Sequence, residues 1–295
     1  MTKKLLKLYL LFLLSFSIHS QNNLLGELDA LLKDDHQYEL PAFKAMKIGN
    51  LQSTKIATSG DFYLVVSHRF GTLKNGFDNF FGLDEANTKI QLLYSFWDNI
   101  QVSVSRESWR KTYAGALKIG ITKQSNNFPF NIVAYGTTTI NSELKKANYP
   151  NLKFGDRVAH VGQLLISKRF SSDFSFEIAP SYIRENLQDL NSTFTANHNQ
   201  FAMAFGGRYK LSNRVSLNAD YSYNFNRDKN STFADPYTIG IDIETGGHIF
   251  QLLFTNAQST NEVGFLSNAT KNDIFFGFNI VRVFSVSYTH LTLPT

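Results

Sequence analysis

The residues of this chain best suited to catalysis are histidines, and their placement gives little support to an active site. His68, His160 and His248 fall on or near the apolar faces of alternating segments, where a polar side chain is unusual. His68 and His160 lie toward one end of their segments and His248 toward the other, so the three cannot form one cluster. A hydrolase that pairs a serine with one of these histidines remains a third hypothesis.

Common catalytic and cofactor motifs are absent from the sequence. It contains no H-E-x-x-H zinc motif, no G-x-S-x-G turn and no glycine-rich phosphate loop. It also has no cysteine, which excludes thiol chemistry and thiolate metal sites. We therefore expect no enzyme activity, no metal and no cofactor.

Charged residues follow a more informative pattern, because they stand opposite apolar residues in segments that alternate with period two. From Val215 to Phe225, apolar and aromatic residues share one face, and Asp220 shares the other with serines and asparagines. If the apolar faces contact lipid, the charged side chains line a lumen. Gln91, Gln101 and Lys210 belong to the same set of polar faces. The predicted lumen residues are Arg69, Lys89, Glu107, Lys118, Arg169, Glu177, Arg208, Asp220, Asp242 and Glu244.

Two interpretations of these charges stay open. Both signs occur in similar number, so they can pair across a narrow lumen, stabilise it and partly obstruct it. Alternatively, they form a polar constriction that selects small solutes by charge.

About twelve alternating segments follow Asp61, and most span 9 to 13 residues. Strands of globular sheets are usually about 5 or 6 residues long, whereas a tilted strand that crosses a bilayer needs about 9–11. Length and alternation together predict an all-β fold, a closed antiparallel transmembrane β-barrel of about twelve strands. The segments are 61–70, 87–96, 99–110, 112–122, 128–140, 158–170, 173–184, 199–211, 214–225, 237–244, 247–255 and 273–284.

The connections between these segments alternate in length. Short polar turns fall at 97–98, 123–127, 171–172, 212–213 and 245–246, and they define a short-turn end. Longer polar stretches at 71–86, 141–157, 185–198, 226–236 and 256–272 define a long-loop end, where only the 110–111 connection is short. This asymmetry is typical of outer-membrane barrels, whose turns are periplasmic.

Aromatic residues gather near both ends of the predicted strands, as expected of side chains at the two interfaces of a bilayer. The alternative is that these rings cap a β-sandwich core, but a sandwich does not need strands of this length. Examples are Phe96, Trp97, Phe170 and Tyr209 at the short-turn end, and Trp109, Tyr113, Phe201 and Phe225 at the long-loop end.

Several stretches resemble an outer-membrane β-barrel family of Gram-negative bacteria that is classed as a domain of unknown function. They are 67–71 (SHRFG), 79–84 (NFFGLD), 206–211 (GGRYKL), 241–248 (IDIETGGH) and 276–280 (FGFNI). The resemblance covers most of the chain after about Ala42. It implies the barrel fold and the outer-membrane location, and it brings no active site with it.

Residues 1–20 are predicted to be a secretory signal peptide. Lys3, Lys4 and Lys7 precede an apolar run from residue 8 to 16, and Ser20 is a plausible cleavage point. The run is too short to cross a bilayer, which needs roughly 20 apolar residues. We expect export to the outer membrane, with both termini in the periplasm.

Net charge argues against nucleic acid as a partner. The chain has 29 Lys and Arg against 24 Asp and Glu, a net charge of +5. Three of the lysines lie in the leader, and without them 26 basic residues leave an excess of only +2. A protein that binds a phosphate backbone normally carries a much larger basic excess.

Residues 21–57 are predicted to form a periplasmic N-terminal segment. Leu24 to Leu32 can form a short amphipathic helix, with five leucines on one stripe. This segment can contact the periplasmic rim, plug the lumen, bind a periplasmic partner through residues 22–57, or act as a simple linker. All four interpretations remain open.

The barrel is predicted to span residues 58–286. Residues 287–295 fit no strand pattern and resemble translated sequencing-adapter read-through. We expect this tail to be non-native and poorly packed.

The leading functional hypothesis is a porin-like pore or channel for small polar solutes, embedded in outer-membrane lipid. The alternative is a non-transporting barrel with a closed lumen, which has a structural or partner-binding role. The barrel-wall hydrolase comes third.

Overall fold

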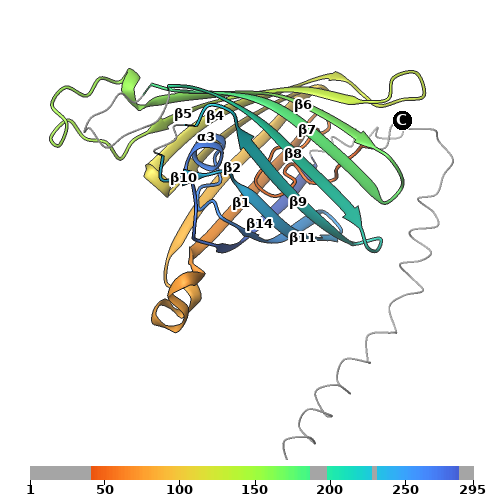
Figure 1. Ribbon diagram of the computed structural model, residues 1–295. Coiled ribbons are helices and arrows are strands. Elements are labelled where there is room, and N and C mark those ends of the chain that lie inside the picture. The colour runs from red at the N-terminus through yellow and green to blue at the C-terminus, as the bar shows by residue number, and fades with distance from the viewer. Residues whose placement is uncertain (1–40, 187–197, 228–230, 286–295) are drawn as a thin grey trace, which may run out of the picture. The chain divides into compact units, whose positions relative to one another are not determined.

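The computed structural model describes residues 41–186, 198–227 and 231–285. Twelve strands form one closed barrel in which each strand pairs antiparallel with its neighbours (Figure 1). The first strand, β1 (Asp61–Thr72), pairs with the last, β14 (Phe275–Ser285), and this pairing closes the sheet. The predicted all-β fold, a closed antiparallel barrel of about twelve strands, is confirmed.

The remaining barrel strands follow one another in chain order around the sheet. They are β2 (Ala86–Trp97), β3 (Ile100–Glu107), β4 (Thr112–Thr122), β5 (Asn131–Asn141), β6 (Val158–Arg169), β7 (Phe174–Glu185), β8 (Asn199–Lys210), β9 (Val215–Asn224), β11 (Tyr237–Thr245) and β12 (His248–Thr255). Two further short strands, β10 (Phe233–Ala234) and β13 (Ala269–Thr270), pair with each other outside the barrel sheet.

Most strand bounds agree with the sequence prediction to within two residues. The predicted strand 99–110 is shorter, because β3 ends at Glu107 and the short helix η3 (Trp109–Lys111) follows. Arg110 (φ 50°) and Lys111 (φ 47°) adopt left-handed backbone conformations there. This conformation turns the chain within four residues at the end where other connections are long.

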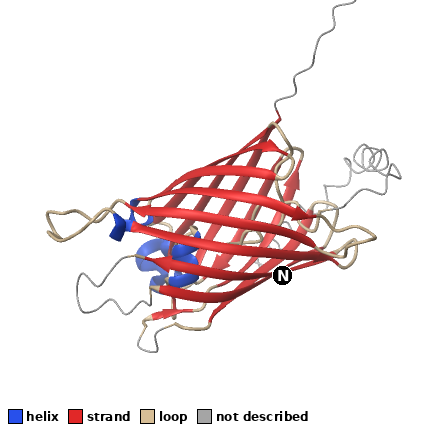
Figure 2. Cartoon of the chain, turned by 90° about the horizontal axis from the view of Figure 1, so that it is seen from above, coloured by secondary structure: helices blue, strands red, loops and turns tan. Residues whose placement is uncertain are grey.

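Helices occur in the connections of the long-loop end, as Figure 2 shows for the blue segments near one end of the strands. They are η2 (Leu73–Gly82), η3, η4 (Gly155–Arg157) and α3 (Glu262–Ser267). Within the described ranges, none of these helices has the length and apolar character that a membrane crossing requires.

The two faces of each strand differ as the alternation predicts. Large apolar side chains point outward and are exposed, for example Val104 and Ile239, each 61% exposed. Trp97 and Tyr209 add exposed rings at the short-turn end, and Phe225 adds one at the long-loop end. The inward faces of β2, β9 and β11 are buried and mostly polar.

The interior of the barrel is filled by two segments of the chain itself. Residues 42–53 are almost all buried, and so are residues 256–267. The sequence placed 256–272 among polar loops, but α3 is buried along its whole length. Phe265 and Leu266 explain the difference, because they bury their apolar side chains in the core.

Three predictions lie outside the described residues. They concern the signal peptide at 1–20, the helix at 24–32 and the tail at 287–295.

Candidate functional site in the barrel lumen

Residues 41–57, which we call the N-terminal plug, form a hairpin inside the barrel. The backbone N–H of Ile48 donates to the carbonyl of Leu51 at 2.8 Å, which makes a tight turn. The N–H of Ser53 donates to the carbonyl of Met46 at 3.1 Å and joins the two arms. The hairpin therefore forms some of its backbone hydrogen bonds internally, and its other backbone groups face the barrel wall.

The tip of the hairpin fits tightly against the wall. A Cβ added to Gly49 would lie 2.7 Å from the Oδ2 atom of Asp220 and 2.7 Å from the Cγ2 atom of Thr238. Both contacts are closer than a real Cβ tolerates. Glycine is required at the tip, because a side chain there would prevent the backbone from lying this close to β9 and β11.

The two arms of the N-terminal plug both extend to the short-turn end of the barrel. The Nζ atom of Lys44 contacts Glu244 at 2.6 Å, beside the turn between β11 and β12. At the other end of the hairpin, the N–H of Ser59 donates to Asp98 at 2.9 Å, in the turn between β2 and β3. Both arms therefore reach the same end of the barrel.

The wall that surrounds the plug divides into four sectors in the order of the strands. A basic sector on β1, β2 and β4 lies opposite an acidic sector on β7, β9 and β11. An apolar sector on β5 and β6 lies opposite an amide sector on β12 and β14. The sectors comprise basic Arg69, Lys89 and Lys118, acidic Glu177, Asp220 and Asp242, apolar Val133, Tyr135, Val161 and Leu165, and amide Gln251 and Asn279.

The basic sector donates hydrogen bonds to oxygen atoms of the plug. The Nζ atom of Lys118 donates to the carbonyls of Ser53 at 2.9 Å and Lys55 at 3.1 Å. The Nη2 atom of Arg69 donates to the side-chain oxygen of Asn50 at 2.8 Å. Hydrogen bonds from charged donors are the stronger kind, so these contacts hold the plug firmly.

The acidic sector accepts hydrogen bonds from backbone N–H groups of the plug. The Oδ2 atom of Asp220 accepts from Asn50 at 2.8 Å and from Leu51 at 3.3 Å. The Oε2 atom of Glu177 accepts from the N–H of Thr54 at 2.9 Å. Carboxylates thus accept hydrogen bonds from N–H groups at the turn and in the second arm of the hairpin.

The amide sector binds three carbonyls at the turn of the plug. The Nε2 atom of Gln251 donates to the carbonyls of Lys47 at 3.1 Å and Ile48 at 3.0 Å. The Nδ2 atom of Asn279 donates to the carbonyl of Gly49 at 3.0 Å. Gln251 and Asn279 also hydrogen-bond each other, which orients both amides.

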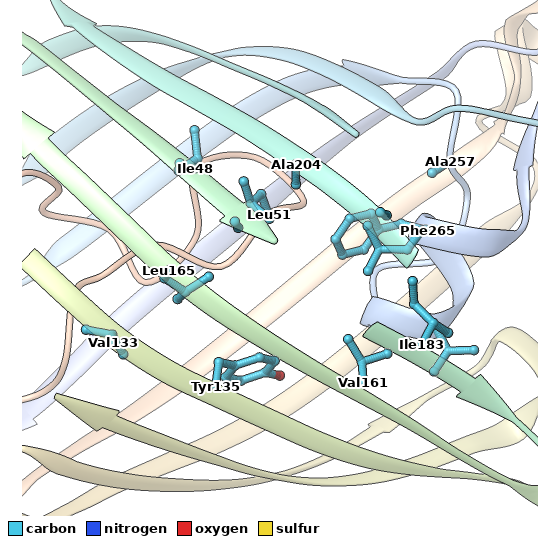
Figure 3. Packing of buried hydrophobic residues seen from close by; sticks show 14 of the residues in the cluster. Ile48, Leu51, Val133, Tyr135, Val161, Leu165, Ile183, Ala204, Ala257 and Phe265 are labelled. Carbon is cyan, nitrogen blue, oxygen red and sulfur yellow. The ribbon is translucent and has the colours of Figure 1, made fainter. Parts of the chain in front are cut away.

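Apolar side chains of the plug pack in a buried cluster with wall residues of β5, β6 and β8. Figure 3 shows Ile48 and Leu51 among Val133, Leu165 and Ala204 of the wall, within one buried cluster. Gly206 on β8 makes room for this packing, because a Cβ there would overlap with the Cδ1 atom of Ile48. The plug therefore has one apolar side and one polar side that match the wall.

A second filling, the α3 segment (residues 256–270), enters from the long-loop end. Glu107 on β3 accepts from the N–H of Thr260 at 2.6 Å and from the side-chain amides of Asn261 and Asn87. Asn261 also caps α3, since its Oδ1 atom accepts from the N–H of Gly264 at 2.8 Å. One buried carboxylate therefore anchors the start of the helix.

The two fillings meet in the middle of the lumen. The Nζ atom of Lys47 donates to the carbonyl of Thr260 at 2.7 Å and lies 3.8 Å from Glu262. Gln52 donates to Glu262 at 2.7 Å. Burial and the nearby Lys89 lower the pKa of Lys47 to about 7. Burial alone would raise the pKa of Glu262, but Lys89, Lys47 and Gln52 lower it to about 2.

Seven of the ten predicted lumen residues are buried in the structure. They contact one of the two fillings or lie in its immediate surroundings. They are Arg69, Lys89, Glu107, Lys118, Glu177, Asp220 and Asp242.

The other three predicted residues lie at the short-turn end. Arg208 and Glu244 form an ion pair of 2.6 Å at the mouth of the barrel, where Lys44 joins them. Arg169 donates instead to the carbonyls of Ser171 and Ser172 in its own turn. Arg169 is therefore not part of the buried site.

Sequence reasoning missed the neutral and distant partners of the site. Gln251 and Asn279 occupy inward positions of alternating strands, so the period-two pattern contains a signal for them. Asn50 and Glu262 lie in segments without strand periodicity, and nothing local marks either as a lumen residue.

The three histidines lie on the outward face of the barrel. His68 hydrogen-bonds the hydroxyl of Thr88 at 2.8 Å and stacks on Phe278 at a centroid distance of 5.1 Å. His160 hydrogen-bonds the hydroxyl of Thr138 at 2.9 Å. In the described part of the chain, no group of three or more His, Asp or Glu residues could hold a metal ion.

Comparison with solved structures finds other barrels. The NanC porin superposes with a TM-score of 0.48 at 10% identity, covering 75% of this chain and 98% of that one. The KdgM porin superposes with a TM-score of 0.47 at 7% identity, covering 75% and 99%. Outer membrane phospholipase A from Escherichia coli gives 0.44 at 14% identity, covering 75% and 89%.

A comparison with curated proteins finds no match. A family described as "Membrane bound beta barrel domain (DUF5777)" matches residues 43–284, a range that includes most of the N-terminal plug and nearly the whole barrel. The apolar outward faces and the closed sheet agree with that description. The chain therefore belongs to this family of membrane-bound β-barrels.

Proposed function

We propose that this protein is an outer-membrane channel for small polar solutes, closed by the N-terminal plug and opened when the plug withdraws through the short-turn end. The observation that carries the proposal is the set of buried charges that hold the plug. Lys118, Glu177 and Asp220 contact the plug through non-covalent hydrogen bonds to its backbone. The same side chains would be hydrated in an open lumen.

The energetic argument concerns the cost of buried charge. An ionised group taken out of water loses several kcal/mol of hydration, and well-packed apolar side chains often replace it without loss of stability. A barrel that stays filled permanently could hold the plug with neutral side chains. A lumen that alternates between filled and open needs polar walls, because only these stay wetted after the plug leaves.

The location is part of the same proposal. Short turns at one end and long loops at the other support an outer-membrane barrel with periplasmic turns. Export by a signal peptide and periplasmic termini fit this orientation, because the plug enters from the short-turn end. A periplasmic partner that binds the chain before residue 41 would then have direct access to the plug.

The test is conductance in planar bilayers. Full-length protein should be mostly closed, and Gly49→Leu should conduct in steps, since the larger side chain overlaps with Asp220 and Thr238. Gly136→Leu is the matched control, because its added side chain points into open space on the outward face. Heat-modifiable gel migration confirms that each barrel is folded. A folded Gly49→Leu barrel without conductance would contradict the channel.

A second candidate function is a permanently closed barrel that binds partners. The α3 segment favours it, because this filling is tied at both ends to barrel strands and is buried in the long-loop half of the lumen. A cavity of about 30 Å³ remains there beside Trp109, Arg157 and Val263, which is room for about two water molecules. Absence of conductance in Gly49→Leu would favour this alternative.

Enzyme activity is not part of the proposal. His68 and His160 are held by threonine hydroxyls on the outward face, and His68 also stacks on an aromatic ring. A hydrolytic triad would instead need a nucleophilic serine hydrogen-bonded to the imidazole and a third side chain that orients the ring. Ester hydrolysis by the purified protein that is lost in His68→Ala or His160→Ala would contradict this.

A further inference from the structure

We infer that the open lumen binds the backbone of a peptide, so that peptides are the substrate class of the proposed channel. The inference rests on the proposed function, because it needs a lumen that the plug can leave. It comes from the manner in which the wall holds the plug, which is mainly through the plug's backbone.

Wall donors bind backbone carbonyls over a continuous stretch of the plug. Gln251 and Asn279 together bind the three consecutive carbonyls of residues 47–49. Lys118 binds the carbonyls of Ser53 and Lys55, two residues apart. In an extended chain, alternate carbonyls point the same way, so one ammonium can bind both.

Wall acceptors bind the N–H groups that lie between these carbonyls. Asp220 accepts from residues 50 and 51, Glu177 accepts from Thr54, and the Oε1 atom of Gln101 accepts from Ala57 at 2.9 Å. Around Thr54 the carbonyl, N–H and carbonyl of successive residues meet Lys118, Glu177 and Lys118 again. The lumen therefore matches the alternating donors and acceptors of a peptide backbone.

Backbone recognition of this kind does not depend on sequence. Every residue except proline offers one N–H and one carbonyl, so another peptide can replace the plug in these contacts. Main-chain hydrogen bonds supply affinity in other proteins that bind extended peptides, and pockets for side chains supply preference. Here the buried apolar cluster on β5, β6 and β8 supplies such a site, which holds Ile48 and Leu51.

Side chains of the plug add further contacts with the wall: Lys44 pairs with Glu244, and the hydroxyls of Thr54 and Ser167 hydrogen-bond each other at 2.6 Å. Asn50 donates to the hydroxyls of Thr238 and Thr255, each at 3.0 Å, and accepts from Arg69 at 2.8 Å. An arbitrary peptide lacks these contacts. Asn50 thus gives the plug an advantage over a substrate, so the channel stays closed until the plug is withdrawn.

The competing explanation is that the wall merely completes the hydrogen bonds of a permanent filling, since any buried backbone needs partners. Neutral side chains would suffice for that purpose. Lys118 and Glu177 are almost completely buried in the filled state, at 1% and 0% exposure. Burying these two charges in the closed state has a desolvation cost. That cost is explained if the same charges bind substrate in the open state.

Current blockade in Gly49→Leu channels tests the inference with defined probes. The first probe is acetyl-tetraalanine amide, a neutral peptide unrelated in sequence to the plug. The second is the matched depsipeptide, in which esters replace two internal amides and remove two N–H donors. The third is maltotriose, a neutral solute of comparable size. Maleimide labelling of a cysteine introduced at Ala45, which is buried in the plug, confirms that Gly49→Leu has displaced it.

We expect the peptide to block at about tenfold lower concentration than either the depsipeptide or maltotriose, which corresponds to about 1.4 kcal/mol. Adding Glu177→Gln and Lys118→Met to Gly49→Leu should abolish the preference for peptide over depsipeptide. Conducting channels that all three probes block equally would overturn the inference and leave the channel intact. No conductance from a labelled, folded variant would overturn the proposed function itself.

Discussion

The two fillings of the lumen differ in how they are tied to the barrel. The α3 segment continues into β12 and β14 at its two ends, and it buries Val263, Phe265 and Leu266 in the core. The N-terminal plug is tied at only one end to a barrel strand, β1. It also buries apolar side chains, among them Phe43, Ile48 and Leu51, and polar wall residues hydrogen-bond its backbone. From this difference in chain attachment we expect the α3 segment to contribute to the barrel's stability, whereas the proposed channel needs a plug that can be displaced.

The absence of cysteine from the chain makes this contrast measurable. A single cysteine at Ala45, which is 4% exposed, reports on plug docking through its rate of labelling by a water-soluble maleimide. The thermal midpoint of heat-modifiable gel migration reports on the barrel. Each variant below is compared on both measurements.

The largest effect is expected at Phe265. Phe265→Ala should destabilise the barrel by about 3–5 kcal/mol, because it removes a fully buried ring from the α3 segment. Leu51→Ala in the plug should instead raise cysteine labelling strongly and change the thermal midpoint little. Equal loss of barrel stability in the two variants would mean that the plug is as structural as the α3 segment.

A smaller effect is expected at Asp220. Asp220→Ala leaves the N–H groups of Asn50 and Leu51 without their carboxylate, which weakens plug docking by about 2 kcal/mol. Cysteine labelling should then rise about 30-fold. Asp78→Ala, at an exposed loop position, is the control and should label like the parent. No change in Asp220→Ala would show that the acidic sector does not hold the plug.

Plug docking should also depend on pH through Lys47. The pKa of Lys47 is lowered to about 7 in the docked plug, from 10.5 in water. The undocked lysine therefore binds more protons between pH 7 and 10.5, and docking strengthens as pH rises through this window. Below pH 7 both states are protonated and this dependence ends. The groups facing Lys47 are Lys89, Glu262, Arg69 and Glu107.

The difference between parent and Lys47→Met isolates this dependence from other titrating groups. From pH 7 to pH 8, labelling of the parent should fall about fivefold relative to Lys47→Met, or about 1 kcal/mol. A constant ratio between the two proteins over this range would show that Lys47 stays charged when docked.

The smallest effect is expected at Lys44. Its contact with Glu244 lies at the mouth of the barrel, and the lysine side chain is 51% exposed. Lys44→Ala should weaken docking by at most about 1 kcal/mol, and high salt should abolish the difference from the parent. A larger, salt-independent effect would place the anchor of the plug at the mouth rather than in the lumen.

The strands and their two faces were predictable because period-two alternation is a local property. Val215 to Phe225 shows which residues point outward and which inward without reference to any other part of the chain. The same reasoning selected Arg69, Glu107 and Asp220 as inward residues. It also selected Arg169, whose side chain donates hydrogen bonds to carbonyls of the adjacent turn. Alternation does not reveal how far along the lumen a side chain lies.

What the inward residues contact was decided only by the tertiary structure. The sequence by itself determined a closed barrel with charges on its inner face, because side chains on a strand alternate between two environments. It did not determine that residues 41–57 and 256–270 fill the barrel. Those segments lack strand periodicity, and their main contacts join residues far apart in the chain, such as Asn50 with Asp220 and Glu107 with Thr260. Such contacts form only once the wall has closed around them.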